Sequence, residues 1–352
     1  MSDAAVRGPT HRRFGTALLA ALALAGVRAE AVEGGSADVP ALLIVAGVGG
    51  TPEHRERFSG WARDLCAAAL EAPAPGRVRV LVERLPEDGE PDASCAPVAR
   101  STQEELAREI EAARGPEAAG AGLVLVLIGH GSAGSSPRFQ LPGPDLSPER
   151  LGEMLSGFGS GPVTIAHLGS AAGAFLPALA GPGRVVLAAT RANETNETRF
   201  PRHFIAALAG DEGDRNKDGR LSILEAFDFA RRGVEREYEQ EGLLRTEHAL
   251  LDDNGDGVGS LEPEMAAGMD GVLAGRRALL IRTEEAVADA SSDTPEIRRL
   301  VAERDALAAR VDVLRETREG MEEEAYLAEL ETLLLQIAEL AERIAALREK
   351  TS

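Results

Sequence analysis

The sequence LVLVLIGHGS, residues 123–132, joins an unbroken apolar run to a glycine-rich turn that carries a histidine. Short runs of valine, isoleucine and leucine bounded by turns are typical of strands buried on both faces of a sheet. Four other runs of this kind occur in the chain, at residues 41–46, 78–85, 163–168 and 185–189. Together they predict a mainly parallel sheet.

Helical patterns alternate with these runs. Residues 52–70, 102–113 and 147–155 are predicted helices, the last with Ser147 as its N-cap and Pro148 at its first position. Strands that alternate with helices are typical of an α/β fold in which helices cover both faces of the sheet. We expect this domain to span residues 38–290.

Polar residues gather where the predicted strands end. In open α/β sheets the chemistry collects beyond the carboxyl ends of the strands. The third strand ends at His130 between two glycines, and the fourth ends in the turn from Gly169 through Ser170 to Gly173. Gly129, Gly131 and Gly134 have the G-x-G-x-x-G spacing of a dinucleotide-binding loop, but no helix is predicted directly after them. The turn at Ser170 does not match the G-x-S-x-G elbow of α/β-hydrolases, because Leu168 stands in place of the first glycine.

These two segments, residues 126–132 and 165–173, carry a family resemblance. They resemble the catalytic-histidine segment and the cysteine-x-serine-glycine segment of the C13 peptidases (legumains) and the wider caspase-like clan. The resemblance covers about residues 41–204. It implies a three-layer α/β sandwich of the caspase and legumain type, with His130 as the catalytic histidine and Ser170 in the place of the nucleophilic cysteine.

The resemblance extends to the loop after the first strand. Arg55 matches an arginine that lines the specificity pocket of legumains. Two positions depart from the family pattern, because Glu53 stands near that arginine in place of asparagine and Leu168 stands in place of an acid.

Ser170 supports two hypotheses. His130 could activate its hydroxyl, with the backbone N–H groups of Gly131 and Gly169 as donors to an oxyanion. A hydroxyl is a poor nucleophile without a base, however, and the sequence shows no acid partner for His130. We therefore favour a site that has lost catalysis and is kept for binding, and we expect His167 to be a hydrogen-bonded core residue.

A twelve-residue loop fits the EF-hand calcium pattern throughout. Such loops supply side-chain oxygens, one backbone carbonyl and a bidentate glutamate, with glycine at the sharp turn, here Gly219. The predicted ligands are Asp214, Asn216, Asp218, Arg220 (through its carbonyl), Ser222 (through water) and Glu225.

A second loop begins in the same way with Asp252, Asn254 and Asp256. Its glutamate, Glu262, comes one position early, and Pro263 occupies the twelfth position. Two Asx-turns explain this loop about as well as a second calcium site does.

A different pattern begins at residue 293. Apolar residues recur at three- and four-residue spacing, with an interruption at Arg304, which predicts two amphipathic helices within residues 293–352. They could fold back as an antiparallel hairpin or coiled coil, or continue as a kinked rod. Packing across a homo-oligomer is an alternative to packing on each other.

The N-terminus has the pattern of a signal peptide, residues 1–29, with Arg12 and Arg13 before a short apolar run and a cleavage site after Ala29. We expect export to the periplasm or outside the cell and no transmembrane span in the mature chain. Cys66 and Cys95 are the two cysteines, and a disulfide between them and two buried thiols are about equally expected. The net charge of −20 argues against a nucleic-acid partner, so we expect none.

The leading hypothesis is therefore an exported caspase- and legumain-like protein without cysteine-peptidase activity. Ca²⁺ would stabilise it, and it would serve as a binding or scaffold protein for a protein or peptide partner. The alternatives are a serine-dependent peptidase or amidase that uses Ser170 and His130, and a structural assembly protein driven by the C-terminal helices.

Overall fold

The structure is a computed structural model that describes residues 40–73, 75–85, 95–114, 122–158, 162–265, 269–284, 286, 293–316, 318 and 322–351. The predicted signal peptide, residues 1–29, lies outside the described residues. Residues from Gly35 to Ser352 belong to one unit.

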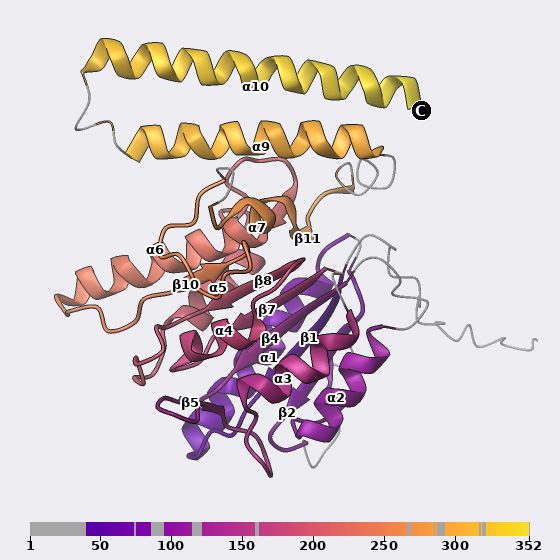
Figure 1. Cartoon of the computed structure of the whole chain (residues 1–352), viewed down its shortest axis with the longest axis vertical. Coiled ribbons are helices and arrows are strands. Elements are labelled where there is room, and N and C mark those ends of the chain that lie inside the picture. Colours follow the sequence, from indigo (N-terminus) through magenta and orange to yellow (C-terminus); the bar gives the residue numbers. More distant parts are fainter. Residues whose placement is uncertain are drawn as a thin grey trace, which may run out of the picture. The chain divides into compact units, whose positions relative to one another are not determined.

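The centre of the fold is a seven-stranded, mainly parallel sheet (Figure 1). Its order is β10-β8-β7-β4-β1-β2-β3, and only β10 runs antiparallel to its neighbour, β8. The strands are β1 (Ala41–Ala46), β2 (Val78–Val82), β3 (Ala99–Arg100), β4 (Leu123–Ile128), β7 (Val163–His167), β8 (Arg184–Ala188) and β10 (Leu250–Asp252). The five predicted apolar runs are all strands. The two short edge strands, β3 and β10, carry too few residues for a periodic signal.

Helices cover both faces of the sheet (Figure 1). One face packs against α1 (Pro52–Leu70), α5 (Phe200–Ala209) and α6 (Ile223–Glu241). The other face packs against α2 (Gln103–Ala112), α3 (Pro148–Leu155) and α4 (Leu176–Leu179). The α/β class predicted from the sequence is confirmed.

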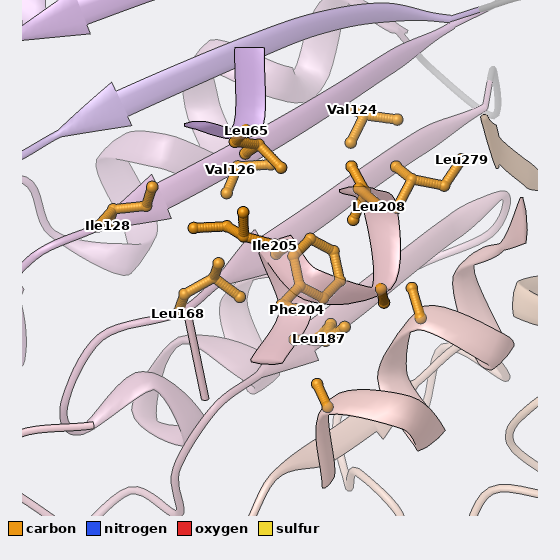
Figure 2. Packing of buried hydrophobic residues seen from close by; sticks show 14 of the residues in the cluster. Leu65, Val124, Val126, Ile128, Leu168, Leu187, Phe204, Ile205, Leu208 and Leu279 are labelled. Atoms are coloured by element: carbon orange, nitrogen blue, oxygen red, sulfur yellow. The ribbon is translucent and has the colours of Figure 1, made fainter. Parts of the chain in front are cut away.

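Alternation along β4 builds the two cores. Val124, Val126 and Ile128 face one core, while the leucines between them face the other. Figure 2 shows the first core, where Leu65 of α1 and Phe204 of α5 lie against these side chains. A strand buried on both faces is thus written as a continuous apolar run.

Three helices begin where the sequence places a capping residue. Thr51, Thr102 and Ser147 each accept a hydrogen bond from the backbone N–H three residues on. These side chains satisfy donors that the first helical turn leaves without a partner.

A disulfide joins Cys66 of α1 to Cys95, ahead of β3. The sequence left this pairing open. The bond links α1 to the segment that leads into the edge strand of the sheet.

Smaller elements complete the α/β region. β5 (Gly131–Ser132) pairs with β6 (Arg138–Phe139), and β9 (Arg220–Ser222) pairs with β11 (Ala278–Ile281), both antiparallel. The short helix α7 (Val272–Arg276) precedes β11.

Two helices end the chain, α9 (Pro295–Glu316) and α10 (Glu323–Thr351). The start of α9 packs on the end of α10, with Ile297 in the same cluster as Ile344, and the end of α9 packs near the start of α10, with Leu314 beside Tyr326. The pair is therefore an antiparallel hairpin rather than a kinked rod. Arg304, which interrupts the apolar stripe, lies 3.1 Å from Asp218 of the acidic loop. Within the described residues, no helix combines the length and apolar character that crossing a membrane requires.

Candidate functional site

Strand pairing brings the predicted catalytic residues to one edge of the sheet. β4 and β7 are parallel neighbours, with Leu127 opposite His167. His130 follows β4, and Ser170 follows β7. The two loops therefore leave the sheet side by side.

Glycines let these loops come into direct contact. A Cβ on Gly131 would overlap the carbonyl oxygen of Ser170, and a Cβ on Gly169 would overlap the carbonyl oxygen of Gly129. Only glycine allows backbones to approach this closely. Close packing of the two loops therefore requires glycine at these positions, whatever the chemistry of the site.

The Ser170 hydroxyl is hydrogen-bonded to backbone. Its Oγ accepts from the Gly131 N–H at 3.0 Å and donates to the Gly131 carbonyl at 3.2 Å. The residue is 4% exposed. In the described part of the chain, no hydrogen bond joins Ser170 to the His130 ring.

Both predicted oxyanion donors are engaged in the same way. The Gly131 N–H is held by Ser170, and the Gly169 N–H donates to Nδ1 of His167 at 3.2 Å. In this arrangement, neither N–H is free to receive an oxyanion.

The turn after Ser170 is fixed by several hydrogen bonds. Ala171 adopts a left-handed conformation with φ of 52°, which costs a residue with a side chain about 1 kcal/mol or more. Its N–H donates to the Glu194 carbonyl at 2.7 Å. Thr190 accepts from Ala172 and donates to the Gly169 carbonyl. The strained turn is thus held in place by the loop that follows β8.

His130 lies among aromatic rings. The ring of Phe58 is 5.0 Å away and that of His54 is 4.9 Å away, both edge to face. Burial lowers the pKa of His130, and the neighbouring charge of His54 lowers it further. The imidazole is therefore neutral at pH 7, as a general base must be.

Arg55 is held by an acid that sequence reasoning missed. Its Nε lies 3.1 Å from Oε2 of Glu83, which also accepts the Gly49 N–H at 3.0 Å. The Arg55 contact lacks the angle of a hydrogen bond and is an ion pair. Glu83 directly follows β2. Its position at the carboxyl end of a predicted strand was a signal available in the sequence.

His167 is a core residue, as predicted. It is fully buried between Phe139 and Phe175, and its Nδ1 accepts the Gly169 N–H. Burial lowers its pKa to about 3. It therefore stays neutral through the physiological range, and its Nε2 is buried without a hydrogen-bond partner.

A cavity of about 530 Å³ is lined by residues of α1, of the loop before α5, of α5 and of α6. Neither His130 nor Ser170 lines it. Its charges are largely paired, with Arg199 on Glu237 and Glu241, and Arg57 on Glu197. The lining residues are Arg57, Trp61, Asn196, Glu197, Thr198, Arg199, Arg202, Glu237, Tyr238 and Glu241.

The first acidic loop runs from the end of α5 into the start of α6. Gly219 has a φ of 78° at the sharp turn, and its N–H donates to Asp214 at 2.9 Å. The side-chain oxygen of Asn216 accepts the Asp218 N–H, and the carboxylate of Asp218 accepts the Arg220 N–H. The predicted oxygen donors thus line the inside of one turn, and residues 220–222 form β9 as the loop leaves it.

Glu225 is the last of the predicted ligands and lies in the first turn of α6. Its carboxylate accepts from the backbone of Arg215 and Asn216 and forms a capping box with Ser222 at the start of α6. Burial raises its pKa to about 7, and the nearby charge of Asp218 adds to this effect. The loop therefore gathers negative charge, of which the share on Asp218 is paired with Arg304 of α9 at 3.1 Å. The carboxyl and amide oxygens are the donors that Ca²⁺ prefers.

The second acidic loop is closed by a residue outside the predicted pattern. Asp270 accepts the N–H groups of Asp253 and Asn254, and Asp253 accepts those of Gly271 and Ala274. Sequence reasoning missed Asp270, because it lies fourteen positions beyond Asp256 and no spacing rule links them. Within the described residues, no three His, Cys, Asp or Glu side chains already converge as a metal site.

No protein-family model matches the chain, and no curated protein matches its sequence.

Proposed function

We propose that this chain is an exported caspase- and legumain-like protein that lacks cysteine-peptidase activity and acts as a calcium-stabilised binding or scaffold protein. The observation that carries this proposal is the state of Ser170. Its hydroxyl is buried, and both of its hydrogen bonds go to the backbone of Gly131. The hydroxyl of an activated serine nucleophile would donate its hydrogen bond to the general base.

The cysteines support the same proposal. The chain has two, and both are in the Cys66–Cys95 disulfide. A cysteine peptidase needs a thiolate beside its histidine, and no thiol remains for that role. The family assignment itself rests on the short motifs around His130 and Ser170 and on the adjacency of β4 and β7.

The cavity lined by residues of α1, α5 and α6 is the candidate binding site for a peptide partner. Arginine side chains meet Trp61 and Tyr238 there, and these three residue types are the most frequent anchors in protein interfaces. Ca²⁺ would bind at the loop from Asp214 to Glu225 and hold α5 and α6 together.

A phosphonate probe directed at activated serines tests the central part of this proposal. The full chain is incubated with the probe in calcium, and modified residues are mapped by mass spectrometry. We expect no modification at Ser170 and no change with thiol reagents. Modification at Ser170 that disappears in His130→Ala would overturn the proposal.

One observation favours the second candidate, a serine-dependent peptidase or amidase. The left-handed Ala171 puts strain directly beside Ser170, and such strain is concentrated at active sites. In that case Ser170→Ala and His130→Ala would each abolish the same activity, because the two residues act as a unit.

The third candidate, a structural assembly protein, rests on the outer face of α10. Leu327, Leu334 and Leu335 are about half exposed there. If they mediate self-association, the full chain with Leu327→Asp and Leu334→Asp should have a smaller mass in solution than the wild type.

A further inference from the structure

The second acidic loop differs from an ordinary pair of Asx-turns in one respect. Asp252 is 1% exposed, and its Oδ2 is buried without a hydrogen-bond partner. An ionised carboxylate left in this state costs several kcal/mol unless a positive charge meets it.

Two further carboxylates lie near enough for their charges to act on Asp252. Asp256 lies in the same loop, and Asp270 comes from the segment before α7 and is 5% exposed. The charges of both act on Asp252 and add to burial in raising its pKa. Among the described residues, no Lys, Arg or His forms an ion pair with any of the three. Arg277 is near enough to act on Asp253, but its guanidinium donates to the carbonyls of Val163 and Gly183.

The three acids share one pattern of hydrogen bonds. Each receives its backbone N–H bonds on Oδ1, from Gly255 for Asp252, from Val258 for Asp256, and from Asp253 and Asn254 for Asp270. The backbone therefore fixes each carboxylate by one oxygen. The second oxygen of Asp252 has no partner, whereas that of Asp256 accepts from the side-chain amide of Asn254 at 3.3 Å.

We infer that the loop from Asp252 to Asp256, closed by Asp270, is a second site for a divalent cation, of which Ca²⁺ fits best. Asp270 takes the part that the missing twelfth-position glutamate plays in an EF-hand loop. Glu262, the glutamate nearest in the sequence, is exposed and takes no part.

The donor set selects the ion. Carboxylate and amide oxygens alone favour a hard cation, and no His or Cys among the described residues lies in the cluster. Ca²⁺ accepts six to eight oxygens in flexible geometry, whereas Mg²⁺ requires a near-ideal octahedron. The carboxylates do not yet converge as a ligand set, so binding requires their Oδ2 atoms to turn toward the ion, which the flexible geometry of Ca²⁺ tolerates.

Calorimetric titration of the full chain with CaCl₂, after treatment with chelator, tests this inference independently of Ser170. Asp252→Asn with Asp270→Asn keeps the acceptor for each backbone N–H but removes both charges. We expect this variant to lose one calcium site relative to the wild type. Glu262→Gln, an exposed acid in the same segment, is the matched control and should lose none.

A variant of the first acidic loop distinguishes calcium binding there from calcium binding at the second loop. Asp214→Ala with Glu225→Ala should retain the site at Asp252 and Asp270, whether or not the first loop binds calcium. An Asn pair that binds as many calcium ions as the wild type, or a Glu262→Gln variant that loses a site, would refute the inference.

Thermal melting in chelator shows whether a variant loses calcium binding only because its fold is damaged. Asp270→Asn alone removes a buried, unpaired charge, so its Tm in chelator should equal or exceed that of the wild type, and its rise with calcium should be smaller. A lower Tm in chelator with an unchanged calcium rise would assign Asp270 a purely structural role and overturn the site.

Discussion

The Ser170 turn and the Asp252 loop are both buried and polar, yet they satisfy their polar atoms in opposite ways. The Ser170 hydroxyl bonds to the Gly131 backbone as donor and acceptor, and the N–H groups beside it are occupied. The Asp252 carboxylate keeps one buried oxygen without a partner. Nε2 of His167, beside the strand-end turn, is also buried without a partner, but that ring is neutral and lies between two aromatic rings. Because an unpaired buried charge costs more than an unpaired neutral group, the difference favours the acidic loop over the strand-end turn as the place for an added ligand.

The largest expected effect would come from forcing the two strand-end loops apart. Gly131→Ala places a methyl group against the carbonyl oxygen of Ser170, a backbone atom that cannot rotate away. We expect a loss of about 3 kcal/mol in the free energy of unfolding, measured by urea denaturation.

Gly60→Ala is the matched control, because nothing lies within 4 Å of the added Cβ in the middle of α1. It should stabilise the chain by about 0.5–1 kcal/mol through helix propensity. Equal losses in the two variants would mean that close contact of the loops does not hold the turn in place.

The next effect concerns acid stability and His167. Its pKa in the folded state is about 3, below the value of about 6.5 in the unfolded chain. The unfolded state therefore binds more protons as the pH falls below 6.5, and the folded state loses about 3 kcal/mol from this residue by pH 4.

His167→Asn keeps an acceptor for the Gly169 N–H but does not titrate. The stability of this variant relative to the wild type should therefore improve steadily between pH 6.5 and pH 4, as followed by thermal melting. Parallel curves for the two proteins over that range would show that His167 is not the buried, neutral group described above.

A smaller effect should follow from removing the Ser170 hydroxyl. Ser170→Ala leaves the half-buried Gly131 N–H without an acceptor and should cost about 1–2 kcal/mol. Ser156, whose exposed hydroxyl donates to the Glu153 carbonyl, provides the control, and Ser156→Ala should cost much less. A Ser170→Ala variant as stable as the wild type would favour a serine kept for chemistry rather than for structure.

The sequence predicted the α/β fold well, because the central strands are buried on both faces and are therefore written as continuous apolar runs. The helix start at Ser147 was visible for an equally local reason, since capping depends on residues three positions apart. β3 and β10 were not predicted, because two or three residues are too few to show the hydrophobic pattern of a strand.

The site was predicted less completely. Strand order placed His130 and Ser170 together, but the direction of the Ser170 hydroxyl depends on how closely two loops approach, and sequence does not encode that distance locally. Glu83 and Asp270 reach their sites through tertiary structure, and only the first had a signal in its position at a strand end.

The central claim is that ligand binding belongs to the acidic loops while Ser170 is structural. Thermal melting of the full chain, in calcium and in chelator, tests it most directly when three proteins are compared: the wild type, Ser170→Ala, and a variant that combines Asp214→Ala, Glu225→Ala, Asp252→Asn and Asp270→Asn. Saturating calcium stabilises a folded state that binds it by about 2.7 kcal/mol at a hundredfold excess over Kd. We predict the same calcium-dependent rise in Tm for the wild type and Ser170→Ala, and no rise for the acidic-loop variant. An unchanged rise in the acidic-loop variant, or its loss in Ser170→Ala, would contradict the account.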